Sequence, residues 1–273
     1  MVRRTMNKAL ISLVLLGLVG CLFPTLDGLT GDASVLNEAS TEDASNDVGM
    51  PETSTDGGGD VGEPYCAAYA DAGASTFCED FDSIGDAGAL EPVVSTGVAV
   101  TLNTTDYTSP PASMFVTIAP ADASGVFHGS VKQSMSFTAT TCTLDFDMKV
   151  AVGPATANVA ELDLAGRELL IAVYNGGLFV EEDAPPPDGG SVMLFNHPTI
   201  AFTWDSMWHH IHFVLSLSSQ TSTLTIDGTP KESNYPLAGN WVPGTVTFVY
   251  GVSYAANGPW TIGQDNVLLQ LAP

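Results

Sequence analysis

The chain has 273 residues, of which 31 are Asp or Glu and only 7 are Lys or Arg, so its formal net charge is -24. A chain with so few cations cannot neutralise phosphates, and we therefore expect no nucleic-acid partner. Its hydrophobic content of 45% is enough for a packed core, which excludes a wholly disordered chain.

The N-terminus has the pattern of an export signal. Arg3, Arg4 and Lys8 precede an apolar run, residues 9–19, that is shorter than the roughly 20 residues of a membrane-spanning helix. The run ends in Leu-Val-Gly-Cys at Cys21, which resembles the signal of bacterial lipoproteins. The resemblance implies a signal peptide over residues 1–20, a lipid on Cys21 and, because Leu22 follows, attachment to the outer membrane of a bacterial cell envelope. A plain secretory signal with a chance Cys is the alternative.

Residues 21–63 are expected to form a flexible, acidic tether after the lipidated Cys21. The segment has ten acidic residues and no Lys or Arg, and its apolar residues follow no period. Such a composition buries too little surface to offset the entropy of ordering. The remaining residues, 64–273, keep 21 acidic and four cationic side chains and have the size of one domain.

The domain is predicted to be all-β. Residues 141–150 alternate strictly between apolar and polar side chains, as a half-buried antiparallel strand does. About a dozen short strands with little helix indicate a sandwich or barrel. The expected strands are residues 93–102, 113–118, 141–150, 159–164, 168–174, 178–182, 200–204, 208–217, 222–227, 245–253 and 265–271.

Residues 208–228 carry the most specific pattern: Trp-His-His, an apolar strand, a polar turn, and a second strand that ends on Asp227-Gly228. This resembles the central hairpin of laminin-G-like, concanavalin A-like jelly rolls, with Trp208 in the core. Residues 77–82 and 262–268 resemble the first and last strands of such domains. The resemblance implies an antiparallel β-sandwich in which those two strands lie side by side.

Three cysteines remain in the domain, in an oxidising compartment if the chain is exported. We prefer a disulfide between Cys66 and Cys78, which close a short loop. Cys142 lies on the apolar face of its strand and is expected to be a buried thiol. Pairing of Cys78 with Cys142 is the alternative.

The sequence contains two candidate metal sites. His210 and His212 point to one face of a strand and could share a zinc ion, but a third ligand is not visible, so a polar outer face is preferred. The resemblance to jelly rolls implies a structural Ca²⁺ near the terminal strands, with Glu79, Asp80 and Asp265 at the matching positions.

Glu161 and Asp163 are candidate catalytic residues. They match the first two positions of the Glu-x-Asp-x-x-Glu motif of family 16 glycoside hydrolases, which these residues resemble, but Ala165 or Gly166 stands where the second Glu is expected. Retaining hydrolysis needs two carboxyl groups about 5–5.5 Å apart. Glu168 can supply the second one only if the chain turns back near Gly166.

Aromatic side chains in expected loops favour carbohydrate binding, with Trp241, Tyr254, Asn257 and Trp260 as the candidates. The sequence therefore predicts a lipid-anchored envelope protein that binds a glycan or a surface protein. A glycoside hydrolase or polysaccharide lyase that uses Glu161 and Asp163, and a structural protein without a small ligand, are the alternatives.

Overall fold

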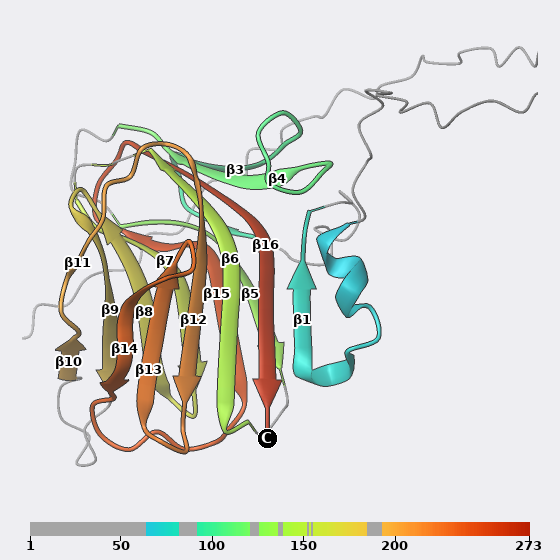
Figure 1. The fold of residues 1–273 in the computed structure, drawn as a ribbon. Coiled ribbons are helices and arrows are strands. Elements are labelled where there is room, and N and C mark those ends of the chain that lie inside the picture. The colour runs from blue at the N-terminus through green and yellow to red at the C-terminus, as the bar shows by residue number, and fades with distance from the viewer. Residues whose placement is uncertain are drawn as a thin grey trace, which may run out of the picture. The chain divides into compact units, whose positions relative to one another are not determined.

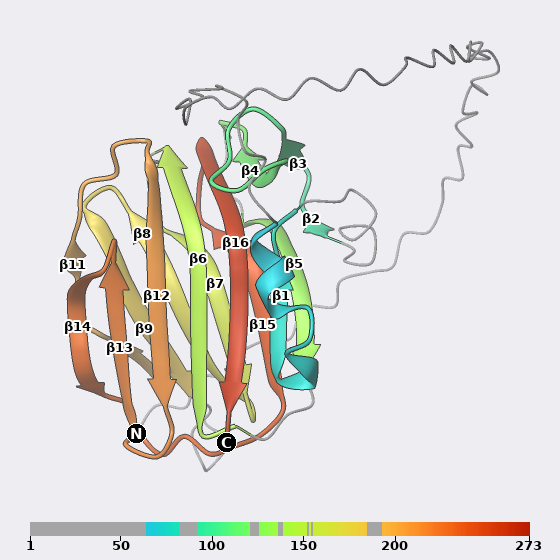
Figure 2. The same ribbon diagram turned by 45° about the vertical axis from the view of Figure 1, so that its right-hand side comes forward.

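Two antiparallel β-sheets lie face to face in the computed structural model of this protein (Figure 1, Figure 2). The structure describes residues 64–81, 92–120, 126–135, 139–151, 153, 155–184 and 193–273. The signal peptide, Cys21 and the tether expected over residues 1–63 lie outside these ranges. No helix in the described part is long and apolar enough to span a membrane. The predicted all-β sandwich is confirmed.

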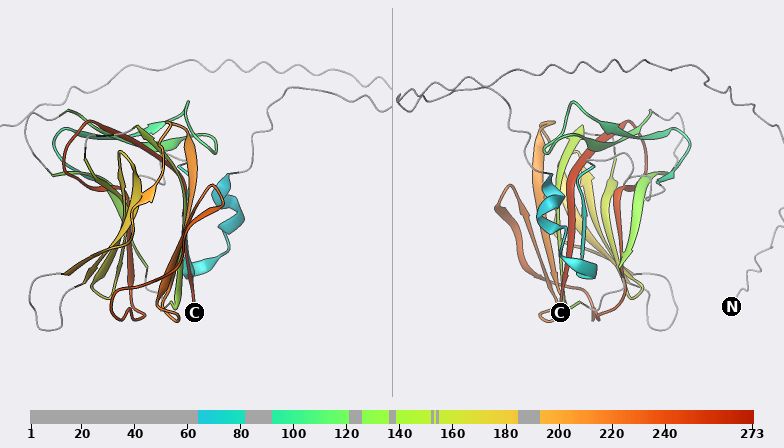
Figure 3. Two further views of the ribbon diagram at one scale, coloured as in Figure 1. Left: turned by 60° about the vertical axis from the view of Figure 1, so that its left-hand side comes forward. Right: turned by 90° about the vertical axis from the view of Figure 1, so that its right-hand side faces the viewer.

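Sheet A contains the strands nearest the viewer in Figure 1 and runs in the order β14-β13-β12-β6-β16-β4-β3, with β1 also paired to β16. Its strands are β1 (Thr76–Glu79), β3 (Val98–Asn103), β4 (Ser113–Ile118), β6 (Thr141–Ala151), β12 (Trp208–Ser216), β13 (Thr221–Ile226), β14 (Thr229–Pro236) and β16 (Trp260–Ala272). β3 and β4 curve over one end of the sandwich (Figure 3).

Sheet B runs in the order β10-β9-β8-β7-β15-β5-β2, and β11 also pairs with β9. Its strands are β2 (Val93–Val94), β5 (Phe127–Met135), β7 (Ala157–Leu164), β8 (Arg167–Tyr174), β9 (Gly177–Ala184), β10 (Met193–Asn196), β11 (Ile200–Ala201) and β15 (Val246–Ala255). Two short 3₁₀ helices, η1 (Tyr65–Tyr69) and η2 (Gly73–Ser75), precede β1.

The core fills the space between the inner faces of the two sheets. Along β6 every second side chain is buried, including Leu144, Phe146 and Met148, and the residues between them are only partly covered. This is the alternation expected from the sequence, and it follows from the two-residue period of a strand. Burial of large apolar side chains on both inner faces supplies the main stabilising free energy of such a sandwich.

The predicted hairpin and the pairing of the terminal strands are both confirmed. β12 pairs with β13 from Ile211↔Ile226 to Ser216↔Thr221. Asp227 and Gly228 then turn the chain into β14, with φ of 50° and 69°, the left-handed conformation that a two-residue hairpin turn requires. β1 lies beside β16 in antiparallel register, as the jelly-roll resemblance implies.

Some strand boundaries were predicted wrongly. The expected strand 93–102 is two strands in different sheets, because residues 95–97 turn the chain and Gly97 has a φ of 83°. The expected strand 200–204 ends at Ala201. β5 and β14 were not expected, since the polar side chains in these segments hide the strand period, and β10 was not expected because it is only 4 residues long.

The cysteines are arranged as preferred from the sequence. Cys66 and Cys78 form a disulfide that ties η1 to β1. Cys142 is a free, buried thiol on the inner face of β6. Burial raises the pKa of the Cys142 thiol to about 11, so at neutral pH it is neutral and unreactive.

Candidate functional site

The outer face of sheet B carries two rows of acidic side chains. The register places Glu168 between Asp163 on β7 and Asp183 on β9, and it places Glu161 and Glu181 in the next outward row. The alternate residues of β7 are buried, so these carboxylates point away from the core. We call this set the sheet B carboxylates: Glu161, Asp163, Glu168, Glu181 and Asp183.

A tight turn at Ala165-Gly166 creates the opposition of Asp163 and Glu168. Both turn residues have positive φ, 55° and 79°, and the Asp163 carboxylate accepts a hydrogen bond of 3.1 Å from the backbone N–H of Gly166. β8 therefore returns directly beside β7. Glu168, and not residue 165 or 166, is thus the carboxyl group that lies opposite Asp163 across the hairpin.

The environments of Glu168, Glu181 and Asp183 raise the pKa values of these three carboxyl groups. Burial raises the pKa of Glu168, and the charges of Glu161, Asp183 and Asp163 raise it further, against the opposing effect of Lys132. Burial also raises the pKa of Asp183. A carboxyl group with a raised pKa beside other carboxylates is the arrangement in which one group holds a proton and another stays ionised.

Aromatic and amide side chains lie at the other end of this face. The register aligns Phe179 on β9 with Ala172 on β8 and with Asn158 on β7, which pairs with Tyr254 on β15. The ring of Phe179 lies 6.2 Å from that of Tyr174. Tyr254 is 38% exposed. Rings and an amide therefore adjoin the sheet B carboxylates on one surface.

Two of the predicted sugar-stacking residues are in the core. Trp241 and Trp260 are 2% and 1% exposed, so neither indole ring offers a face to a ligand. The Nε1–H of Trp241 donates to buried Glu182, and Arg167 lies over its ring. The prediction that these two rings stack on a sugar was therefore wrong, because residues that lie near loops in the sequence pack between the sheets.

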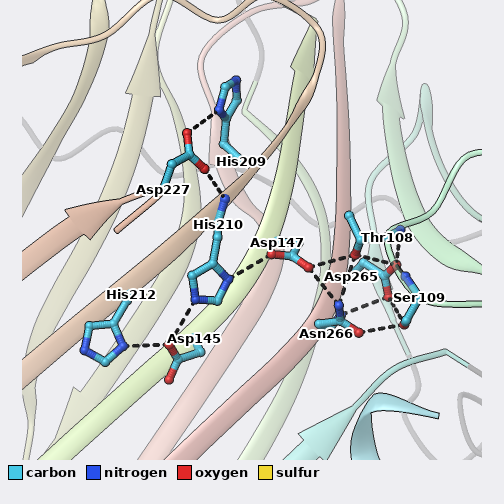
Figure 4. Close-up of polar contacts among 10 residues, drawn as sticks. All are labelled: Thr108, Ser109, Asp145, Asp147, His209, His210, His212, Asp227, Asp265 and Asn266. Carbon is cyan, nitrogen blue, oxygen red and sulfur yellow. Dashed lines mark hydrogen bonds and ion pairs between the residues drawn. The ribbon is translucent and has the colours of Figure 1, made fainter. Parts of the chain in front are cut away.

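The histidine pair lies on the outer face of sheet A, on the opposite side of the sandwich (Figure 4). His212 Nδ1 is 2.6 Å from an oxygen of Asp145, and His210 Nδ1 is 2.9 Å from an oxygen of Asp147. Hydrogen bonds to Asp145 and Asp147 raise the pKa of His210 to about 10. At neutral pH His210 is therefore an imidazolium, which can donate hydrogen bonds but cannot act as a base.

His209 points to the other side of β12. Its ring contacts Phe202 at 4.8 Å, and its two nitrogens lie within 3.0 Å of carboxylate oxygens of Asp205 and Asp227. Within the described ranges, no three His, Cys, Asp or Glu side chains are grouped so that they could hold a metal ion. The polar outer face preferred from the sequence fits this arrangement.

The residues predicted to hold calcium are buried but engaged in different contacts. Asp265 accepts hydrogen bonds from the backbone N–H groups of Thr108 and Ser109, at 2.7 and 3.0 Å (Figure 4). Asp80 accepts one from the backbone of Cys66 and Glu79 one from the backbone of Phe81. These bonds tie loops to the terminal strands. Calcium binding stays a prediction, and a melting temperature that is the same in calcium and in chelator would contradict it.

A buried ionic triad, which the sequence did not predict, joins the two sheets. His197 lies between Glu182 of β9 and Glu232 of β14, with nitrogen–oxygen distances of 2.8 and 3.0 Å. Burial alone would lower the pKa of His197, but the hydrogen bonds to both carboxylates outweigh it and raise the pKa to about 9. The triad therefore carries an imidazolium at neutral pH.

No family model and no curated protein sequence matches the chain. Among solved structures, an endo-β-1,4-glucuronan lyase from the fungus Trichoderma reesei aligns with a TM-score of 0.57 at 15% identity, over 72% of this chain and 95% of that one. The cellulose induced protein Cip1 aligns with a TM-score of 0.50 at 14% identity, over 71% of this chain and 96% of that one. At these identities the likeness shows a shared jelly-roll fold.

Proposed function

We propose that this protein binds a glycan through the outer face of sheet B and is held in a bacterial cell envelope by a lipid on Cys21. The observation that carries the proposal is the juxtaposition of the sheet B carboxylates with exposed Tyr254 and with Asn158 on adjoining strands. Carboxylates accept hydrogen bonds from sugar hydroxyls, and aromatic rings pack on the apolar faces of sugar rings.

The fold and the net charge of the domain restrict the class of glycan that this face can bind. One protein with this fold is named a lyase of a polysaccharide, so a glycan ligand suits the architecture, although the fold alone does not assign the function. The domain carries 21 acidic and four cationic side chains. A polymer with a carboxylate on every unit would be repelled by this face, so the ligand we propose is a mainly neutral glycan.

Retention on insoluble neutral polysaccharides tests the proposal. Glu161→Gln and Tyr254→Ala should each weaken retention about tenfold, the effect of losing a charged hydrogen bond or a ring contact. Asp71→Asn and Tyr107→Ala are matched controls, because Asp71 is exposed outside the sheet and Tyr107, at 39%, is as exposed as Tyr254. Equal losses in the control and test variants, or no retention of the wild type on any glycan, would contradict the proposal.

Glycoside hydrolysis is the second candidate function, and the position of Glu168 favours it. Side chains that are opposite in an antiparallel pair have Cβ atoms about 4.5–5.5 Å apart, so the carboxyl groups of Asp163 and Glu168 are within reach of the separation of about 5–5.5 Å that a retaining enzyme needs. Glu168, with its raised pKa, would be the acid and Asp163 the nucleophile. Release of reducing ends that Glu168→Gln and Asp163→Asn both abolish would establish this activity.

A lyase acting on a uronate polymer is less favoured. Such a reaction needs a cation beside the sugar carboxylate. On the described part of this face, the register brings one cation, Lys132, into the row of Glu161. The sheet B carboxylates around Lys132 outweigh its single positive charge, so this face would repel the carboxylate of a uronate.

The anchor is tested separately. Cys21→Ser should move the protein from the membrane fraction to the soluble fraction and abolish labelling with a fatty-acid probe, because stable attachment depends on the acyl chains. An unchanged distribution and unchanged labelling would contradict lipidation of Cys21 without bearing on glycan binding.

A further inference from the structure

A pocket of about 460 Å³ lies at an edge of the sandwich, between β11 of sheet B and β14 of sheet A. Residues 198–201 form one wall, residues 230–233 form the other, and Tyr235 completes the lining. We call it the edge pocket. It is separate from the sheet B carboxylates, which lie on the outer face of the same sheet.

Lys231 is the unusual feature of this pocket. It is partly buried and lies 5.6 Å from the centre of the Phe202 ring, and among the described residues it makes no ion pair. Lys149 pairs with Asp106, and Arg167 approaches Glu182. Lys132 also makes no ion pair in the described part of the chain, but it is exposed on the outer face of sheet B and is not among the residues that line the edge pocket. Acidic side chains outnumber cations 21 to 4 in this domain, so an ammonium group without an ion pair is unusual. Because it lies beside a pocket, an anionic ligand in the pocket could form an ion pair with it.

The carboxylate that lines the pocket does not neutralise Lys231. Glu232 is buried, and its oxygens accept hydrogen bonds from the hydroxyl of Ser222 and contact protonated His197. His197 and Arg167 already face the two carboxylates of the triad, Glu182 and Glu232, so the triad leaves no carboxylate over for Lys231. Asp205 and Asp227 contact His209, which lies against Phe202, and in the described part of the chain neither forms an ion pair with Lys231.

The rest of the lining suits a sugar. Thr199 and Ser233 provide hydroxyl groups, and the ring of Tyr235 lies 4.1 Å from that of His197, which fixes its position. Pockets that combine an aromatic ring with a few polar groups are typical of small-ligand sites. We infer that the edge pocket binds an acidic sugar unit, such as a uronic acid, whose carboxylate pairs with Lys231.

The inference rests on the proposed glycan-binding function and specifies its ligand. Ala201 lines the pocket and pairs with Gly177 at the edge of sheet B, and a second hollow of about 390 Å³ adjoins it around Asn175 and Phe202. The pocket therefore borders the aromatic end of the sheet B face. The ligand that fits both places is a mainly neutral glycan that carries an occasional acidic unit.

Titration of the purified full-length protein with single sugars, followed by ligand-observed NMR, tests the inference. Glucuronate should bind saturably in the millimolar range. Glucose, which lacks the carboxylate, and acetate, which lacks the sugar ring, should each bind at least about tenfold more weakly. Lys231→Gln should weaken glucuronate binding at least about tenfold, whereas Lys231→Arg should retain most of it. Lys149→Gln, which removes a lysine from sheet A, away from the edge pocket and from the sheet B face, is the matched control.

The outcomes are distinct. Equal binding of glucuronate by the wild type and Lys231→Gln would place the ligand elsewhere and overturn the inference. Equal affinities for glucuronate and glucose, or for glucuronate and acetate, would overturn it as well, as would no binding. Retention of the Lys231→Gln protein on neutral polysaccharide reports on the proposed function independently, since that assay depends on Glu161 and Tyr254.

Discussion

The imidazole of His197 lies 2.8 Å from the carboxylate of Glu182, and both side chains are buried between the two sheets. Glu232 contacts the other ring nitrogen, so the charge of the imidazolium holds two strands from opposite sheets together. An ion group in this position makes the stability of the sandwich depend on pH and on each member of the group.

Raising the pH should destabilise the domain through His197. Its pKa is about 9 in the folded state and 6.5 in its ordinary environment, so between these values the folded state binds more protons than the unfolded state. The stabilisation is complete below pH 6.5 and is lost as the pH rises through 9, a change of about 3 kcal/mol. Urea denaturation from pH 6 to 10 measures it, and NMR titration of the His197 ring in the wild type identifies the group. A ring that titrates near 6.5 would contradict the prediction.

Removing the disulfide should destabilise the fold without changing its topology. Cys66 and Cys78 are separated by 12 positions in the sequence, and a loop of this size contributes about 3 kcal/mol in the chain-entropy model. Denaturation of Cys66→Ser/Cys78→Ser should show this loss. Cys142→Ala is the control, because it removes the buried free thiol without placing a polar group in the core. A double variant as stable as the wild type would show that the cross-link adds nothing to stability.

Gly177→Ala should be more damaging than Gly166→Ala, although both glycines have positive φ. A Cβ atom at residue 177 would lie 1.9 Å from the backbone oxygen of Ile200, where β11 pairs with β9, whereas one at residue 166 meets nothing within 4 Å. We expect about 1 kcal/mol for the strain at Gly166 and at least about twice that at Gly177. If urea denaturation shows similar losses of stability for the two variants, β11 can move away from residue 177 at little cost.

The pKa of Glu168 should respond in opposite directions to two substitutions on the same face. Glu161→Gln removes a negative charge and should lower the raised pKa, whereas Lys132→Gln removes a positive charge and should raise it further. NMR titration of the Glu168 carboxyl carbon measures both shifts. The sheet B carboxylates do not interact as described if neither substitution moves the value.

His210 should remain protonated far above neutrality. Its bonds to Asp145 and Asp147 raise its pKa to about 10, and Asp147→Asn should lower that value by removing one charge and one strong acceptor. The chemical shift of the ring during a titration from pH 5 to 11 reports the midpoint. A midpoint near 6.5 in the wild type would show that the His210 ring is solvated and not hydrogen-bonded to Asp145 and Asp147.

Local patterns predicted much of the fold. Alternation along residues 141–150 and the turn residues Asp227-Gly228 depend on neighbours in the sequence, so the sequence contains the information for β6 and for the turn that follows β13. The disulfide between Cys66 and Cys78 was also favoured by proximity in the chain. β14 was missed because its Pro, Lys, Glu and Asn residues hide the apolar period.

The candidate site depends on contacts between distant parts of the chain, which single-sequence patterns do not contain. Glu182 lies between two other acidic residues, Glu181 and Asp183, and no pattern in the sequence distinguishes it from them. In the structure, however, Glu182 is buried and contacts His197. Trp241 and Trp260 follow loops and proved to be core residues. Glu168 was predicted to reach Asp163 only if the chain turned near Gly166, and the positive φ at Ala165 and Gly166 provides that turn.

The disulfide also determines the path of a mechanical load. If the protein is tethered at its N-terminal side, a pull along the chain reaches Cys66 and crosses the sulfur–sulfur bond directly to Cys78 in β1, so residues 67–77 bear no tension. The force is then applied within β1, whose hydrogen bonds to β16 resist it. η1 and the loop after it are protected from stretching, and the first event under load is the separation of β1 from β16.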